Sequence, residues 1–233
     1  MAGLDPSRRA VVRHVPLGKA DYRGTLEFQR ALRARRAEGA IDDLIITVEH
    51  EPVFTIGRRG SSEHLLVSRE AVEEEGIAII EVDRGGGITY HGPGQLVVYP
   101  ILDLRAYGRD IKAYIGRLEE AAIRTLIGYG VDAVRAPGRP GVWVEGRKIA
   151  SVGVHVRRWI TTHGLALNVE VDRRHFAMIR PCGLPVEVVS LNELIAQPVN
   201  VEEVGERFLA QAASLFEWSV QRMPSDEVRS VGG

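Results

Sequence analysis

Apolar residues recur at helical spacing in three long segments of the chain. Residues 25–37 and 110–128 show this pattern, and the second of these begins with an aspartate suited to the N-cap position. Residues 200–218 begin with Asn200 and Glu203, which resemble a capping box. Each segment is predicted to form a helix. In the middle one we expect the inward stripe to consist of Ile111, Tyr114, Ile115, Leu118, Ala122 and Leu126.

Short apolar runs bounded by glycine, proline and polar residues predict the strands. Glu145 and Gly146 form a plausible hairpin turn between two such runs. The predicted strands are residues 43–50, 52–57, 77–82, 95–102, 131–136, 141–156 and 162–171.

The order of these elements indicates the fold class. Helices flank a group of consecutive strands at both ends of the chain, and two shorter helices are predicted at residues 69–76 and 173–179. No internal repeat or linker divides the sequence. We therefore expect one α+β domain over residues 1–233, with a mixed, mostly antiparallel sheet flanked by helices, in preference to a doubly wound parallel sheet.

Composition narrows the function classes. The 233 residues are 45% hydrophobic, with a net charge of -1 and a pI near 6.7. This balance excludes a strongly basic nucleic-acid binder, although paired arginines such as Arg157-Arg158 could steer an acidic partner as well as form ordinary solvated surface. No segment is apolar enough for a signal peptide or a membrane span, so we expect a cytoplasmic protein that does not bind membranes.

The cysteine and histidine content argues against a disulfide or a metal site. The chain has a single cysteine, which rules out an intramolecular disulfide, and seven scattered histidines without metal-ligand spacing. We expect no metal and no cofactor.

A glycine-rich stretch, "DRGGGITYHGPGQ" at residues 83–95, joins two of the predicted strands. It can be a tight connection between strands, or a place where backbone comes close to a ligand, because glycine lacks a Cβ. The bulky polar residues Tyr90 and His91 favour the second interpretation. Neither this stretch nor residues 141–148 fits a phosphate-binding loop, since the latter carry Arg147 where the lysine should stand.

Cys182 and Lys148 are the candidates for covalent and proton-transfer chemistry. Cys182 lies between Pro181 and Gly183 in "RPCGLP", and a nearby cation would favour its thiolate. Lys148 begins the apolar run "KIASVGVHV", where a lysine would be partly desolvated. A buried structural thiol and a solvated surface lysine are the alternatives.

Three motifs together resemble the lipoyl(octanoyl) transferase family, the octanoyl-[acyl-carrier-protein]:protein N-octanoyltransferases. They are "RGGGITYHGPGQLVVYPILDL", "GRKIASVGVHVRRWITTHGLALNV" and "RPCGLP", with "EHEPVFTIGRRG" as an early segment. The similarity covers about residues 43–218, which leaves the N-terminal segment and the tail peripheral. It implies the fold of biotin and lipoate protein ligases.

The resemblance also implies site residues. The family's catalytic cysteine falls on Cys182 and its essential lysine on Lys148. The implied substrate-binding residues are Arg84, Gly85, Gly86, Gly87, Ile88, Thr89, Tyr90, His91, Ser151, Val152, Gly153, Gly164, Leu165 and Ala166.

The implied activity is an acyl transfer in lipoate biosynthesis. An octanoyl group leaves acyl carrier protein, forms a thioester with the cysteine, and ends on a lysine of a lipoyl domain. The implied partners are acyl carrier protein, the lipoyl domains of 2-oxoacid dehydrogenase E2 subunits, and the glycine cleavage H protein. An ATP-dependent lipoate ligase, a transferase that moves octanoyl between lipoyl domains, and a carrier-protein binding module remain the alternatives.

Overall fold

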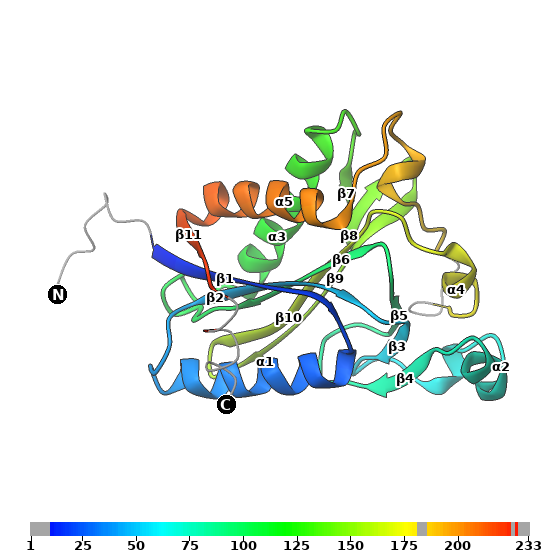
Figure 1. Ribbon diagram of the computed structural model, residues 1–233, viewed down its shortest axis with the longest axis horizontal. Coiled ribbons are helices and arrows are strands. Elements are labelled where there is room, and N and C mark those ends of the chain that lie inside the picture. The colour runs from blue at the N-terminus through cyan, green and yellow to red at the C-terminus, as the bar shows by residue number, and fades with distance from the viewer. Residues whose placement is uncertain (1–9, 181–185, 225–226, 228–233) are drawn as a thin grey trace.

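The structure is a computed structural model that describes residues 10–180, 186–224 and 227. Within these residues the strands form two sheets, one of eight strands and one of three. Figure 1 shows the large sheet between helices on both of its faces, with the small sheet beside it. Cys182 lies outside the described residues.

The large sheet is mixed and mostly antiparallel. Its strand Ala10–Ala20 pairs in parallel with both of its neighbours, and the remaining strand pairs are antiparallel. In spatial order it contains β11 (Trp218–Arg222), β1 (Ala10–Ala20), β2 (Leu44–His50), β6 (Gln95–Ile101), β10 (Ile160–Asn168), β9 (Arg147–Arg157), β8 (Arg139–Val144) and β7 (Val134–Ala136).

Helices cover both faces of this sheet. On one face α1 (Tyr22–Ala37) packs against β6 and β10, and on the other α3 (Ile111–Ile127) and α5 (Val201–Phe216) pack against each other and the sheet (Figure 1). The buried strand β6 serves both layers, because successive side chains of a strand point to opposite faces. Leu96 and Val98 join the core under α3 and α5, whereas Val97 and Tyr99 join the core under α1.

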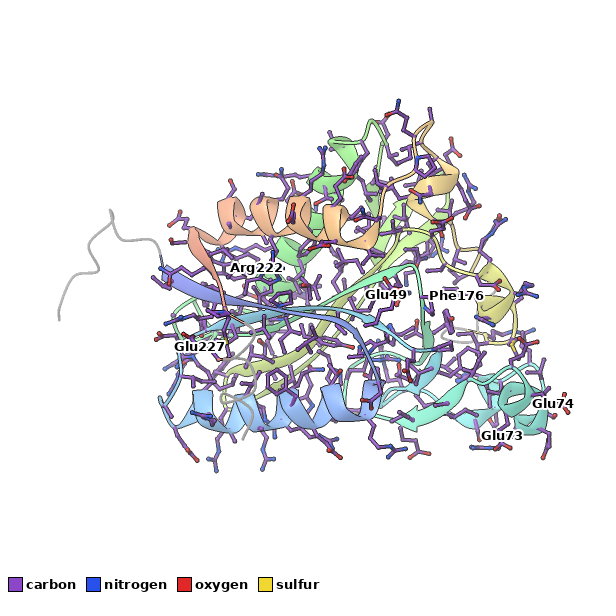
Figure 2. All side chains as sticks on the ribbon, viewed as in Figure 1. Glu49, Glu73, Glu74, Phe176, Arg222 and Glu227 are labelled. Carbon is purple, nitrogen blue, oxygen red and sulfur yellow. The ribbon has the colours of Figure 1, made fainter. Side chains whose placement is uncertain are left out.

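The small sheet has its own apolar core, in which Phe176 packs with residues of the small sheet. Figure 2 shows Glu73 and Glu74 at the outer side of a short helix, where both are exposed. The elements of this region are β4 (Ala78–Glu81), β3 (Val53–Ile56), β5 (Ile88–His91), α2 (Arg69–Glu74), α4 (Arg173–Ala177) and the 3₁₀ turn η1 (Ser62–His64); a second 3₁₀ turn, η3 (Leu191–Glu193), lies before α5.

The structure confirms the predicted α+β class with a mixed sheet. The predicted caps form: Asp110 Oδ1 accepts a hydrogen bond from the Ala113 amide at 3.0 Å, and Asn200 Oδ1 accepts one from the Glu203 amide at 2.8 Å. Within the described residues, no helix is both long and apolar enough to cross a membrane.

Three local predictions were wrong. Ile111 does not point inward but is 39% exposed, because it occupies the first turn of α3, before the helix reaches the sheet. The last long helix ends at Phe216, since Glu217 adopts a left-handed conformation, and Trp218 begins a strand instead. Part of the glycine-rich stretch, Ile88–His91, is itself a strand.

Candidate active site

A narrow cavity lies between the glycine-rich segment and the strands β9 and β10. Its volume is about 80 Å³. Most of the predicted substrate-binding residues line it: Arg84, Gly86, Gly87, Ile88, Thr89, His91, Ser151, Val152, Gly153, Gly164, Leu165 and Ala166.

The register of β9 and β10 brings two of the predicted segments together. Ser151 pairs with Ala166, Val152 with Leu165, and Gly153 with Gly164. Because facing residues of an antiparallel pair share one side of the sheet, both segments contribute to the same wall. At Gly164 an added Cβ would lie 2.1 Å from the Val98 carbonyl oxygen, so the sheet itself requires glycine there.

The glycine-rich segment is bound backbone to backbone on both sides. The amides of Gly57 and Arg59 donate to the carbonyls of Gly87 and Gly86, at 3.1 and 3.0 Å. On the other side the Gly85 amide donates to the Val154 carbonyl of β9 at 3.0 Å. The segment is therefore both a tight connection and a wall of the cavity, which combines the two interpretations left open by the sequence.

Arg84 is a buried cation that stiffens this wall. Its Nη2 donates to the carbonyl and hydroxyl oxygens of Thr55, each at 2.8 Å, and its Nη1 donates to the Gly85 carbonyl at 3.0 Å. The Arg84 side chain also comes so close to two glycines outside this segment, Gly57 and Gly153, that a Cβ at either position would crowd it. A Cβ at Gly57 would lie 2.8 Å from Arg84 Nη1, and one at Gly153 would lie 3.1 Å from Arg84 Cδ.

A chain of buried hydrogen bonds fixes the orientation of His91. Its Nδ1 lies 2.7 Å from Gln95 Oε1, which can only accept, so Nδ1 carries the proton and Nε2 keeps its lone pair. Gln95 Nε2 in turn donates to Asn168 Oδ1 at 2.9 Å, and Asn168 Nδ2 donates to the Val189 carbonyl at 3.2 Å. Burial, with the neighbouring His50 and Arg84, holds the pKa of His91 well below 6.5, so this imidazole is neutral at physiological pH.

Polar side chains form the end of the cavity near α1. His163 Nε2 lies 3.0 Å from Asp83 Oδ1, and this hydrogen bond holds the pKa of Asp83 far below its usual range. Burial lowers the pKa of His163, which the carboxylate only partly opposes, so the imidazole is a neutral donor. His163 has a positive φ of 57°, and its backbone N–H donates a hydrogen bond to Gln29 Oε1 at 2.8 Å, which holds this conformation.

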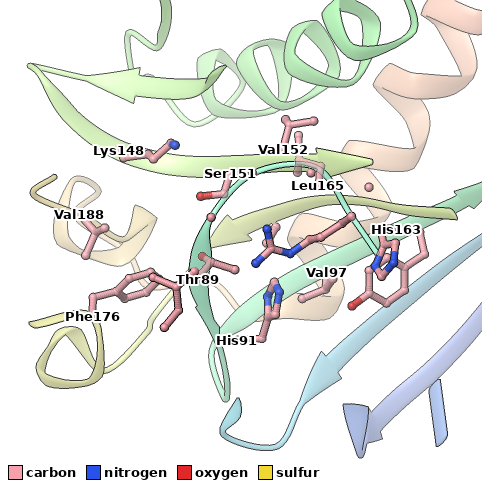
Figure 3. A pocket seen from close by; sticks show the side chains of 18 of the residues that line it. Thr89, His91, Val97, Lys148, Ser151, Val152, His163, Leu165, Phe176 and Val188 are labelled. Atoms are coloured by element: carbon pink, nitrogen blue, oxygen red, sulfur yellow. The ribbon is translucent and has the colours of Figure 1, made fainter. Parts of the chain in front are cut away.

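Lys148 lies at the other end of the cavity. Figure 3 shows its side chain on β9, away from His163. His163 pairs with Val154, and at the rise of a strand the separation along β9 from Lys148 to Val154 is about 20 Å. The cavity is thus elongated, with neutral and hydrogen-bonded polar groups at one end and the Lys148 side chain at the other.

The backbone of Lys148 is bonded to the segment that follows "RPCGLP". Its amide donates to the Glu187 carbonyl at 2.8 Å, and the Val189 amide donates to its carbonyl at 3.0 Å. Lys148 and Val188 form an isolated parallel bridge. The structure thus joins the lysine to the chain that continues from Cys182, although it does not describe the cysteine itself.

Two predicted residues do not line the cavity. Tyr90 points into the small core, where its ring packs against Phe54 and Phe176 and its hydroxyl lies 2.8 Å from His175 Nδ1. Gly85 uses its backbone to hold the segment to β9 and is not part of the lining. In the described part of the chain, no three His, Cys, Asp or Glu side chains are placed to hold a metal ion.

The structure also adds lining residues that were not among the predicted ones. They come from α1, β6, β10, α4 and the segment before η3. Val97, Tyr99 and His163 lie within the motifs quoted above, whereas the others belong to no short motif. Only three of the chain's 30 basic residues are lysines, and one of these is the predicted Lys148. The added residues are Tyr22, Val97, Tyr99, His163, Phe176, Val186 and Val188.

This geometry suits a linear acyl group. An elongated, narrow slot with a lysine at one end can hold a thin chain and supply a proton acceptor near its reactive carbon. The chain is also similar to proteins of a known family. The family described as "Lipoyl protein ligase A/B catalytic domain" matches residues 21–213.

Relatives within this family are similar over most of their length. An octanoyltransferase of Solibacter usitatus is 48% identical over 204 residues, which cover 88% of this chain and 92% of the relative. An octanoyltransferase of Geobacter metallireducens is 43% identical over 189 residues, which cover 81% and 85%. The chain belongs to the lipoyl protein ligase A/B catalytic domain family. Within it the chain is a member of the octanoyltransferases, so it is an enzyme of the acyltransferase class, as the motifs predicted.

Solved structures share the fold. A lipoate protein ligase of Thermoplasma acidophilum superposes with a TM-score of 0.72 at 16% identity, covering 97% of this chain and 91% of its own. The biotin protein ligase of Aquifex aeolicus gives a TM-score of 0.56 at 11% identity, covering 88% and 70%. The predicted similarity to the biotin and lipoate ligase fold is confirmed.

Proposed function

We propose that this chain transfers an octanoyl group from acyl carrier protein to a lysine of lipoyl domains, through a thioester on Cys182. The observation that carries the proposal is the elongated cavity with Lys148 at one end. Burial of the acyl chain contributes about 0.8 kcal/mol per CH₂ group, which amounts to several kcal/mol for eight carbons. The names of the relatives point to the same acyl group.

The first half of the reaction loads the enzyme. Lys148 Nζ, as the neutral amine, accepts the proton of the Cys182 thiol, and the thiolate attacks the carbonyl carbon of the octanoyl thioester. The bond between this carbon and the phosphopantetheine sulfur breaks, and that sulfur takes the proton back from Lys148. One thioester replaces another, so the step is nearly isoenergetic and needs no ATP.

The second half forms the amide. The neutral amine of the lipoyl-domain lysine attacks the Cys182 thioester and loses a proton to Lys148, which returns it to the departing Cys182 sulfur. Backbone amides near Cys182 or in the Ser151–Gly153 segment stabilise the oxyanion. His91 is too weak a base to take this proton because its pKa is lowered well below 6.5, so it contributes a hydrogen-bond acceptor in the cavity wall.

The proposal implies two kinds of protein as acceptors of the octanoyl group. They are lipoyl domains of E2 subunits and the glycine cleavage H protein, each of which presents a lysine. A solved archaeal relative of this fold is described together with its E2 lipoyl domain. Recognition of both the carrier and the acceptor occurs at the Lys148 end of the cavity.

The experiment is an intact-mass measurement. Wild-type protein, Cys182→Ala and Lys148→Arg are each incubated with octanoyl-acyl carrier protein without ATP. We expect an octanoyl increment on the wild type, none on Cys182→Ala, and loading slowed by a factor of about 10² or more in Lys148→Arg, because a guanidinium cannot accept the proton.

The alternatives give different results. An increment that appears only with free octanoate or lipoate and ATP would identify a ligase and overturn the proposal. An increment that appears only with an octanoylated lipoyl domain as donor would identify transfer between lipoyl domains. Loading of Lys148→Arg at the wild-type rate would remove the lysine from proton transfer.

A further inference from the structure

Strand β8 builds a slot around the side chain of Lys148. Trp143 is the direct cross-strand partner of Lys148 in the β8–β9 hairpin. The ammonium Nζ lies 5.1 Å from the centroid of the Trp143 ring, within the range of a cation–π interaction. The ring is only 2% exposed, so it is a fixed platform.

The ring is itself held in place. Its Nε1 donates to the Arg139 carbonyl at 3.0 Å, which sets the orientation of the indole. The Arg139 guanidinium lies 3.8 Å from the ring centroid. The indole of Trp143 is therefore immobilised by contacts within its own strand before it meets Lys148.

Gly141 completes the slot from the same strand. An added Cβ there would lie 2.7 Å from Lys148 Cε and 2.4 Å from the Ala150 carbonyl oxygen, which leaves no room for any other residue. Its φ of +113° also favours glycine. Its amide donates to Glu119 Oε1 at 2.8 Å, which ties the slot to α3.

We propose that Trp143 and Gly141 are positioning residues, which hold the Nζ of Lys148 in one place at the end of the cavity. A lysine has a flexible four-carbon stem with three rotatable donors, so it needs external contacts to be fixed. Its catalytic consequence rests on the proposed function. If Lys148 transfers protons, its misplacement by about 1 Å lowers kcat up to 10²-fold without changing substrate affinity to the same degree.

The chain offers a direct probe, because Lys19, Lys112 and Lys148 are its only lysines. In protein labelled with ¹³C at lysine, three sets of Cε–Hε signals are expected, and Lys148→Arg identifies one of them. The ring current of Trp143 shifts the Lys148 signals upfield from those of Lys19 and Lys112. Trp143→Leu abolishes this shift, Trp143→Phe keeps most of it, and the matched change Trp159→Leu leaves it unaltered.

Kinetics of octanoyl transfer supply the second readout. Trp143→Leu and Gly141→Ala lower kcat by roughly 10- to 100-fold with a smaller change in KM, whereas Trp143→Phe recovers most of the loss and Trp159→Leu keeps kcat. Circular dichroism of each variant checks that the fold is retained.

The outcomes separate the two proposals. Wild-type Lys148 signals that coincide with those of Lys19 and Lys112 would overturn the slot, whatever the activity. An unchanged kcat in Trp143→Leu would also overturn it. A shifted Lys148 signal in a protein that transfers no octanoyl group leaves the slot standing and refutes the proposed function.

Discussion

The buried amide of Gln95 shows how single residues hold the site. It accepts from His91 with one end and donates to Asn168 with the other, so two more side chains depend on it. Inside a protein such a chain of hydrogen bonds is stabilising when each member is paired, and costly when one is removed. Gln95 does not line the cavity. Its hydrogen bond to Nδ1 of His91 nevertheless determines that Nε2 is the nitrogen that keeps the lone pair.

Replacing Gln95 tests this role. Gln95→Leu leaves two buried groups without partners, the Nδ1–H of His91 and the side-chain Oδ1 of Asn168. Each such group lowers the stability of the fold by about 1 to 3 kcal/mol. We expect the free energy of unfolding, measured with urea, to fall by about 2 kcal/mol or more. The exposed Gln221→Leu is the control, with a change within about 0.5 kcal/mol. Equal stabilities for the two variants would show that the network is not stabilising.

At the scale of elements, the close approach of strands determines where glycine is needed. Gly164 of β10 faces the Val98 carbonyl and Pro100 Cδ, at 2.1 and 2.8 Å from a notional Cβ. Gly116 of α3 has open space around the same position and does not have a positive φ. The two glycines therefore predict opposite effects for the same substitution.

Gly164→Ala forces β6 and β10 apart and is expected to lower the free energy of unfolding by about 1 to 3 kcal/mol, as overpacking does. Gly116→Ala is expected to raise it by about 0.5 to 1 kcal/mol, since alanine favours a helix interior. Thermal unfolding followed by circular dichroism compares them. A stabilised Gly164→Ala would mean that the strands separate at little cost.

Local signals made most elements predictable, and long-range pairing made the rest difficult. The helices begin where Asp110 and Asn200 cap them, because capping acts within one turn of the chain. The strand β1 was not anticipated, since Pro16 interrupts its pattern, and the structure accommodates it with a register shift between Pro16 and Gly18. The end of α5 carries no glycine, because Glu217 itself takes the left-handed conformation.

The site residues were likewise predictable where the signal is local, and difficult to predict where long-range contacts place them. The motifs located the glycine-rich wall and the facing segments of β9 and β10, which lie near each other in the sequence or in one hairpin. Tyr22 could not be predicted, because α1 meets β10 only in the folded chain, and nothing in the second motif indicates that His163 faces α1. Tyr90 was expected in the wall, but the ring belongs to the core of the small sheet.

At the scale of the whole molecule, buried neutral histidines link stability to pH. Burial lowers the pKa of His14 and of His50 from 6.5 to about 4 in each case. In the unfolded chain both regain ordinary values, so between about pH 6.5 and 4 the unfolded state binds more protons. Acid therefore destabilises the fold in this window, and the stability is recovered as the pH rises.

The expected slope is about 1.4 kcal/mol per pH unit for each of these histidines. Urea unfolding at pH 6, 5.5 and 5, inside this window, measures it. His50→Gln removes one titrating group and should reduce the slope by about that amount, even if the variant is less stable at pH 7. A slope in His50→Gln as steep as in the wild type would contradict the assignment.

The parallel pairing of β1 with β11 has a consequence for synthesis on the ribosome. Ala10 lies beside Trp218 and His14 beside Arg222, so β1 is covered on that side by a strand that is synthesised much later than β1. Until residues 218–222 emerge, β1 exposes an unpaired edge, the kind of surface on which incomplete chains associate. Chains whose synthesis has not yet reached residue 218 therefore carry an exposed strand edge, which pairing with β11 then covers.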